Sequence, residues 1–141
     1  MQQKAPQAMS ILAFDFGSKR IGVAQSAAHS SQAEPLTTLD GEADVWGQVR
    51  HLVEKYQPDL MVVGWPRGLD GQHTAQTALA EEFAHTLEQR FSKRVVLQDE
   101  VLTSEEAGRR ISPKLPLRKQ REVLDAIAAQ IILEDYLREP H

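Results

Sequence analysis

The sequence predicts an α/β fold with a five-stranded mixed sheet flanked by helices. Two apolar strands joined by a four-residue turn open the chain, which is typical of an antiparallel hairpin. Later apolar segments alternate with segments whose apolar residues recur at helical spacing, as in strand–helix crossovers. The sheet should therefore be an antiparallel, hairpin-led meander at its start and parallel afterwards.

The first three strands are expected at residues 11–16, 21–25 and, more weakly, 35–39. A helix should follow, because four apolar residues share one face: Val45, Val49, Leu52 and Tyr56. Residues 60–63 form a continuous apolar run, as expected of a central strand covered on both faces.

The second half continues with a loop at 67–71 and a helix whose apolar face is expected to comprise Ala75, Ala78, Leu79, Phe83 and Leu87. A last strand is predicted at 95–97. Thr103 and Glu106 have the spacing of a capping box, which predicts the start of a short helix. The final helix is expected from about residue 120 to 137.

Length and composition suit one domain over residues 10–138, preceded by a flexible tail at 1–9. Cysteine is absent, so a bound metal would need Asp, Glu or His ligands, which favours Mg²⁺ or Mn²⁺. No apolar stretch approaches the roughly 20 residues of a membrane span. We therefore expect a cytoplasmic protein without a membrane partner.

A basic run interrupts an otherwise acidic chain. The net charge is −4, yet residues 109–121 contain six of the 16 Lys and Arg residues and no acid. Such a local patch can bind nucleic acid, although charge runs also occur as solvated loops. Its candidate substrate-binding residues are Arg109, Arg110, Lys114, Arg118, Lys119 and Arg121.

Asp15 is the most unusual residue, because it lies within the apolar strand at 11–16. A carboxylate buried in such a strand is unfavourable unless it has a partner such as a metal ion, a cation or a substrate. Lys19 and Arg20 follow it in the turn. Both could contact a phosphate, or they could be a solvated pair.

Further acids occur where they could join Asp15. Asp125 shares a helix face with small apolar residues, which predicts that it faces the sheet, although an acid near a helix start also favours the macrodipole. Asp99 and Glu100 end a strand, where α/β sites commonly lie. Three converging acids would form a cation site suited to phosphodiester hydrolysis, in which two divalent ions activate water and stabilise the leaving oxygen.

Four segments closely resemble the YqgF/RuvX family, in the same order and over nearly the whole chain after Met9. They are residues 14–24 (FDFGSKRIGVA), 62–66 (VVGWP) with Asp70-Gly71, 99–107 (DEVLTSEEA) and 125–133 (DAIAAQIIL). The chain departs from the pattern at Trp65, which is usually Leu, at Arg67-Gly68-Leu69, and at Val101 and Ser104.

The resemblance implies a ribonuclease H-like fold related to Holliday junction resolvases and a role in maturing the 5′ end of pre-16S ribosomal RNA. By similarity, Asp15, Glu100 and Asp125 are the catalytic, metal-binding acids. Asp99 is a possible further ligand or a residue that positions Glu100. Arg67, in the loop after the central strand, is a further candidate for substrate binding.

Several alternatives stay open. Asp-Phe-Gly-Ser also resembles the phosphate-binding start of actin-like ATPases and sugar kinases, but these need two lobes. A non-catalytic RNA- or ribosome-binding module is a second rival. Within the nuclease interpretation the nucleic acid could be pre-rRNA, branched DNA or both. The protein could be a monomer or a homodimer, and symmetric junction cleavage requires the dimer.

Overall fold

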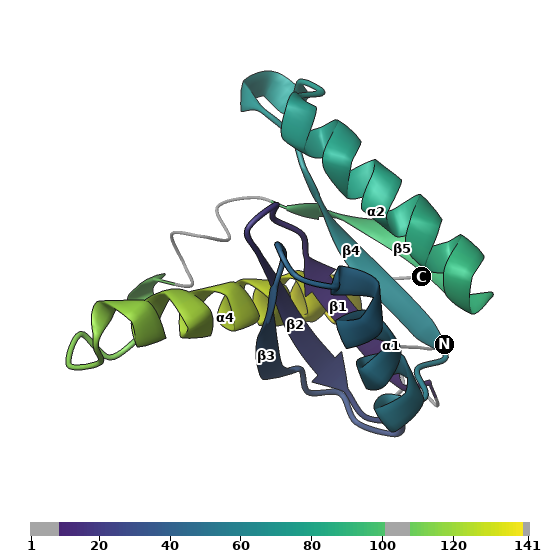
Figure 1. Ribbon diagram of the computed structural model, residues 1–141, viewed down its shortest axis with the longest axis horizontal. Helices are drawn as coiled ribbons and strands as arrows, with labels where there is room; N and C mark the ends of the chain where they lie inside the picture. The colour runs from purple at the N-terminus through teal and green to yellow at the C-terminus, as the bar shows by residue number, and fades with distance from the viewer. Residues whose placement is uncertain (1–8, 101–107, 140–141) are drawn as a thin grey trace.

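The computed structural model describes residues 9–100 and 108–139 and contains a mixed sheet (Figure 1). Its strands are β1 (Ile11–Asp15), β2 (Arg20–Ser26), β3 (Glu34–Asp40), β4 (Leu60–Pro66) and β5 (Arg94–Glu100). They lie in the order β3-β2-β1-β4-β5. The β1–β2 and β2–β3 pairs are antiparallel, whereas β1–β4 and β4–β5 are parallel. This confirms the predicted five-stranded mixed sheet.

The helices cover both faces of the sheet. They are α1 (Val45–Tyr56), the short 3-10 helix η1 (Leu69–Gly71), α2 (Ala75–Phe91) and α4 (Leu117–Arg138). Leu12 and Phe14 of β1 pack in a core with α1 and α2. Ile11 and Ala13 instead pack in a core with α4, which crosses the opposite face (Figure 1). Side chains alternate along a strand, so successive residues of β1 point into the two cores in turn.

Several predicted strands and the last helix are longer in the structure than predicted. β4 continues through Pro66 and β5 through Glu100, because Trp65 and Pro66 pair in register with Asp99 and Glu100. The last helix begins at Leu117, directly after Pro116, rather than near residue 120. Proline fixes φ near the helical value and lacks the N–H that a helix start leaves unpaired, so the helix can begin at once.

The predicted apolar face of α2 was wrong in its first turns. Phe83 and Leu87 are buried as expected, but Ala75, Ala78 and Leu79 are exposed, and Thr77 and Ala80 are buried instead. The reason is the polar start of the helix, where Thr74 and Thr77 form a capping box. Thr77 also donates a hydrogen bond to the carbonyl oxygen of Pro66, which draws this side of the helix to the sheet.

The expected N-terminal tail lies almost wholly outside the described residues, as does the predicted capping box of Thr103 and Glu106. Within residues 9–100 and 108–139, no helix is both long and apolar enough to cross a membrane.

Candidate active site

Asp15 and Glu100 lie at the carboxyl ends of two parallel-aligned strands, on the same face of the sheet. Asp15 follows Ile11 and Ala13 in the alternation of β1, and both of these pack with α4. Glu100 follows Val96 and Gln98 in the alternation of β5. Val96 packs in that same core. The Gln98 side chain donates to Glu139, just after α4. Alternation therefore brings both acids to the α4 face.

The carboxyl groups of Asp15 and Glu100 are hydrogen-bonded to each other. Burial raises the pKa of Asp15 well above its usual range, and the charges of Glu100 and Asp125 raise it further. Burial also raises the pKa of Glu100, but a hydrogen bond with Asp15 acts in the opposite direction. That hydrogen bond raises the pKa of Asp15 and lowers that of Glu100. Among the described residues, neither acid has an ion pair with a basic side chain.

Asp125 reaches the site from α4 because β2 contains glycine where the helix crosses it. Gly22 pairs with Asp15 in the β1–β2 register. A Cβ on Gly22 would overlap the main-chain carbonyl oxygen of Asp125. Only glycine permits this approach of helix backbone to strand backbone. The carboxylate of Asp125 is 19% exposed and accepts a hydrogen bond from Arg20, with 2.6 Å between Nε and Oδ2.

Glu100 depends on a second glycine. A Cβ on Gly64 of β4 would lie 2.8 Å from Oε2 of Glu100 and 2.6 Å from Cδ1 of Ile132. The glycine thus leaves room for the Glu100 side chain beside α4. In the part of the chain that the structure describes, no group of three His, Asp or Glu side chains stands ready-made at metal-ligand spacing.

Asp99 lies on the other face of the sheet, away from these three acids. Its carboxylate forms two hydrogen bonds with Arg67, from Nε at 3.1 Å and from Nη2 at 2.7 Å. The guanidinium carbon of Arg67 also lies 4.5 Å from the ring centroid of Trp65. The structure therefore does not bring Asp99 to Asp15, and it gives Arg67 a carboxylate partner within the chain.

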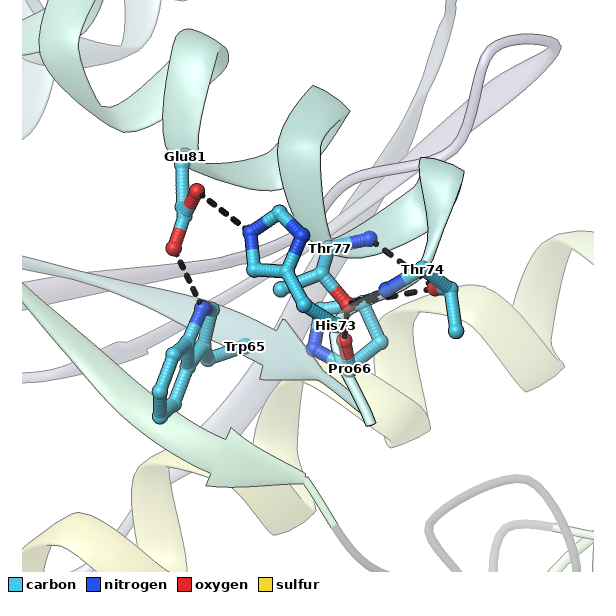
Figure 2. Close-up of polar contacts among 6 residues, drawn as sticks. All are labelled: Trp65, Pro66, His73, Thr74, Thr77 and Glu81. Carbon is cyan, nitrogen blue, oxygen red and sulfur yellow. Dashed lines mark hydrogen bonds and ion pairs between the residues drawn. The ribbon is translucent and has the colours of Figure 1, made fainter. Parts of the chain in front are cut away.

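Trp65 is held by a polar network at the start of α2 (Figure 2). Its indole Nε1 donates to Glu81 at 2.9 Å, and the other oxygen of Glu81 lies 2.9 Å from Nε2 of His73. These hydrogen bonds, that of His73 foremost, lower the pKa of Glu81. The indole is neither fully buried nor free to turn. His73 lies on the surface and has a carboxylate partner in Glu81.

Arg118, Lys119 and Arg121 of the basic run lie in the first turns of α4, whereas Arg109, Arg110 and Lys114 precede the helix. Arg118 and Arg121 precede Asp125 by seven and four residues, so all three share one side of the helix. Cations near a helix N-terminus oppose the macrodipole, and the first turn of α4 contains no acid to offset them. Figure 1 shows these turns extending beyond β3. The same arrangement of helix N-terminus and cations attracts phosphate groups.

Not every member of the run is equally available. Arg110 pairs with Glu134 at 3.0 Å, and Lys119 lies 3.8 Å from Glu122.

Lys19, in the turn between β1 and β2, lines a cavity together with Asp15 and Asp125.

Sequence reasoning missed the importance of Gly22 and the pairing of Arg20. A glycine inside a strand is a recognisable signal of close backbone approach, and Gly22 carried that signal. The Arg20–Asp125 pair gave none, because 105 positions separate its members.

Comparison with solved structures identifies the class of fold. The chain is similar to Thermus thermophilus RuvC, with a TM-score of 0.58 and 13% identity over 92% of this chain and 96% of that one. It is also similar to the Fowlpox virus resolvase, solved with substrate Holliday junction DNA, with a TM-score of 0.59 and 12% identity over 93% and 100% of the two chains. The domain therefore has the ribonuclease H-like fold of RuvC-like resolvases.

Sequence comparison identifies the family. Residues 9–139 match the model of the RuvX family, described as Holliday junction resolvase. A protein of Methylobacillus flagellatus is 44% identical over 129 residues, covering 89% of this chain and 88% of that protein. A protein of Dechloromonas aromatica is 41% identical over 135 residues, covering 94% and 92%. Both bear the name "Putative pre-16S rRNA nuclease". The chain belongs to the RuvX family, as the resemblance predicted.

Proposed function

We propose that this protein is a divalent-metal-dependent endonuclease that hydrolyses phosphodiester bonds in structured nucleic acid. Asp15, Glu100 and Asp125 are its catalytic carboxylates. The observation that carries the proposal is the placement of these acids. β1, β5 and α4 bring them to one face, where the pKa values of Asp15 and Glu100 are raised and no basic side chain of the described residues neutralises that pair.

The chemistry of the donors fits a hard divalent cation. All three side chains offer carboxylate oxygens, which Mg²⁺ and Mn²⁺ prefer. Burial and the neighbouring carboxylates raise the pKa of Asp15, and a bound cation would relieve that unfavourable charge. A metal held here would supply an activated water and stabilise the leaving oxygen.

The remaining residues bind and orient the substrate. Arg118 and Arg121 present positive charge along the helix side that leads to Asp125, where they can hold phosphates of the bound strand. Each phosphate contact of this kind releases counterions, so binding should weaken as salt concentration rises. Arg20 and Lys19 contribute at the site itself, where both line the cavity beside Asp15.

The substrate we propose is the precursor of 16S ribosomal RNA, cleaved in the maturation of its 5′ end. The names of the M. flagellatus and D. aromatica relatives support this substrate. The description of the family favours a second candidate, the four-way DNA junction. Symmetric cleavage of a junction requires two sites and therefore a homodimer. Either role places the protein in the cytoplasm.

The test is cleavage of matched pre-16S 5′-leader RNA and four-way DNA junctions in Mg²⁺ or Mn²⁺. The wild-type protein should cleave the RNA faster than the junction, and Asp15→Asn should cleave neither. Preference for the junction, together with a dimer in solution, would favour the resolvase instead. Normal 5′-end maturation in cells that carry only Asp15→Asn would support a non-catalytic binding module and contradict the proposal.

A further inference from the structure

A cavity of about 280 Å³ lies between the β1–β2 turn and α4, and both acidic and basic residues line it. Two acids, Asp15 and Asp125, and two bases, Lys19 and Arg20, line it together with residues 16–18 of the turn. Such a cavity can accept a cation at its acids and an anion at its bases. A phosphodiester group bound to a divalent cation is a ligand of this kind.

Arg20 is paired with one of the two acids, Asp125. Its Nε lies 2.6 Å from Oδ2 of Asp125, and within the described residues the guanidinium forms no other hydrogen bond. A guanidinium carries five N–H donors, so most of them are available to a ligand in the cavity. The Arg20 side chain is 41% exposed and lies at the first residue of β2, where it can change rotamer without disturbing the core.

Arg20 and a divalent cation compete for the carboxylate of Asp125. A divalent cation ligated by that carboxylate would lie beside the positive charge of Arg20, and their repulsion is strong in a partly buried site. Arg20 must therefore move when the cation binds. The partner that best replaces a carboxylate for a guanidinium is a phosphate, to which arginine can donate two parallel hydrogen bonds.

We propose that Arg20 exchanges partners during binding: it pairs with Asp125 in the metal-free protein and with the substrate phosphodiester once a divalent cation occupies the acids. The proposal rests on the proposed nuclease function and adds a coupling to it. Arg20 opposes cation binding when no phosphate is present and favours phosphate binding once the cation is present. Because coupling is reciprocal, substrate should strengthen cation binding in the wild-type protein.

The experiment measures Mn²⁺ binding by calorimetry without nucleic acid. Arg20→Gln should bind Mn²⁺ more tightly than wild type, by roughly 3- to 10-fold, since a competing charge has been removed. Arg20→Lys should stay close to wild type, because it keeps the charge. Arg138→Gln is the matched control: Arg138 also pairs with an aspartate, at 3.0 Å from Asp135, but at the far end of α4. It should not change Mn²⁺ binding.

The second readout is the KM for pre-16S leader RNA. Arg20→Gln and Arg20→Lys should both raise KM, because neither side chain can form the two-point contact with a phosphate. Mn²⁺ binding by Arg20→Gln that equals or is weaker than wild type would overturn the exchange, and so would an unchanged KM. The proposed function fails separately, if Asp15→Asn still binds Mn²⁺ and cleaves RNA.

Discussion

Asp99 and Glu100 are adjacent at the end of β5, yet their carboxylates lie on opposite faces of the sheet and have opposite surroundings. Asp99 forms two hydrogen bonds with Arg67 beside α2, and it is 46% exposed. Glu100 faces α4, where burial raises its pKa and its recorded neighbour is another acid, Asp15. Asp99 is paired with a base of its own chain, whereas Glu100 lies beside a second carboxyl group.

The difference separates a structural acid from a candidate functional one. Arg67 belongs to the segment after β4, so its bond to Asp99 ties the ends of β4 and β5 together. That tie holds the strand end from which Glu100 projects to the other face. Asp15 and Glu100 have no basic partner among the described residues, so an added cation would stabilise them, as expected of a site that binds metal.

The largest expected effect comes from substituting the two neighbours in turn. Glu100→Gln should reduce RNA cleavage by about 10³-fold or more, the scale expected when a ligand of a catalytic metal is lost. Asp99→Asn should retain activity within about 10-fold, because it removes only a positioning contact. Single-turnover cleavage measures both, and equal losses would contradict the distinction between the faces.

Gly22→Ala should disrupt the α4 face through its backbone. The new Cβ would overlap the carbonyl oxygen of Asp125, so we expect a destabilisation of about 3 kcal/mol or more in urea unfolding. Gly108→Ala is the control, because a Cβ built there has no neighbouring atom within 4 Å from other segments of the described residues. A mild effect of Gly22→Ala would mean that α4 approaches β2 less closely than described.

The basic run should influence binding through salt. Neutralising Arg118, Lys119 and Arg121 should weaken RNA binding and flatten the slope of log K against log salt by roughly 2, less than one unit per charge. Fluorescence anisotropy at several salt concentrations measures the slope. An unchanged slope would indicate that these residues form only a solvated surface.

Neutralising Asp15 on the α4 face and Asp99 on the α2 face should change the free energy of unfolding in different directions. The folded-state pKa of Asp15 is raised, so the folded protein binds the proton more tightly than the unfolded chain. Its contribution to stability is therefore present at low pH and is lost as pH rises through the raised pKa. Asp15→Asn should stabilise the protein at neutral pH by about 1 kcal/mol, and the gain should shrink towards pH 4. Asp99→Asn should instead be neutral or destabilising, and urea unfolding across pH distinguishes the two.

The smallest effect is expected for the pair that ties β4 to β5. The side chains of Arg67 and Asp99 are 35% and 46% exposed, so solvent screens their attraction. A double-mutant cycle with Arg67→Gln and Asp99→Asn should give a coupling energy of about 0.5 kcal/mol. A coupling energy near zero would mean that the Arg67–Asp99 pair does not help to position Glu100.

The sequence allowed the sheet to be predicted, because its strands follow from local patterns, and the same patterns pointed to the acids that we propose as the site. The sequence alone shows that an apolar strand ends in Asp15 and that Asp125 shares a helix face with small residues. The face of α2 was mispredicted because capping by Thr77 outweighed apolar spacing. The Arg20–Asp125 and Arg67–Asp99 pairs could not be predicted, because no local pattern links partners 105 and 32 positions apart.

The central claim is that the acids on the α4 face bind a divalent cation and that Asp99 does not. Calorimetric titration of Mn²⁺ into wild type, Asp15→Asn and Asp99→Asn tests it without relying on any choice of substrate. We predict that wild type and Asp99→Asn bind Mn²⁺ with similar affinity and that Asp15→Asn shows no binding. Unchanged Mn²⁺ binding by Asp15→Asn, or loss of binding by Asp99→Asn alone, would contradict the account.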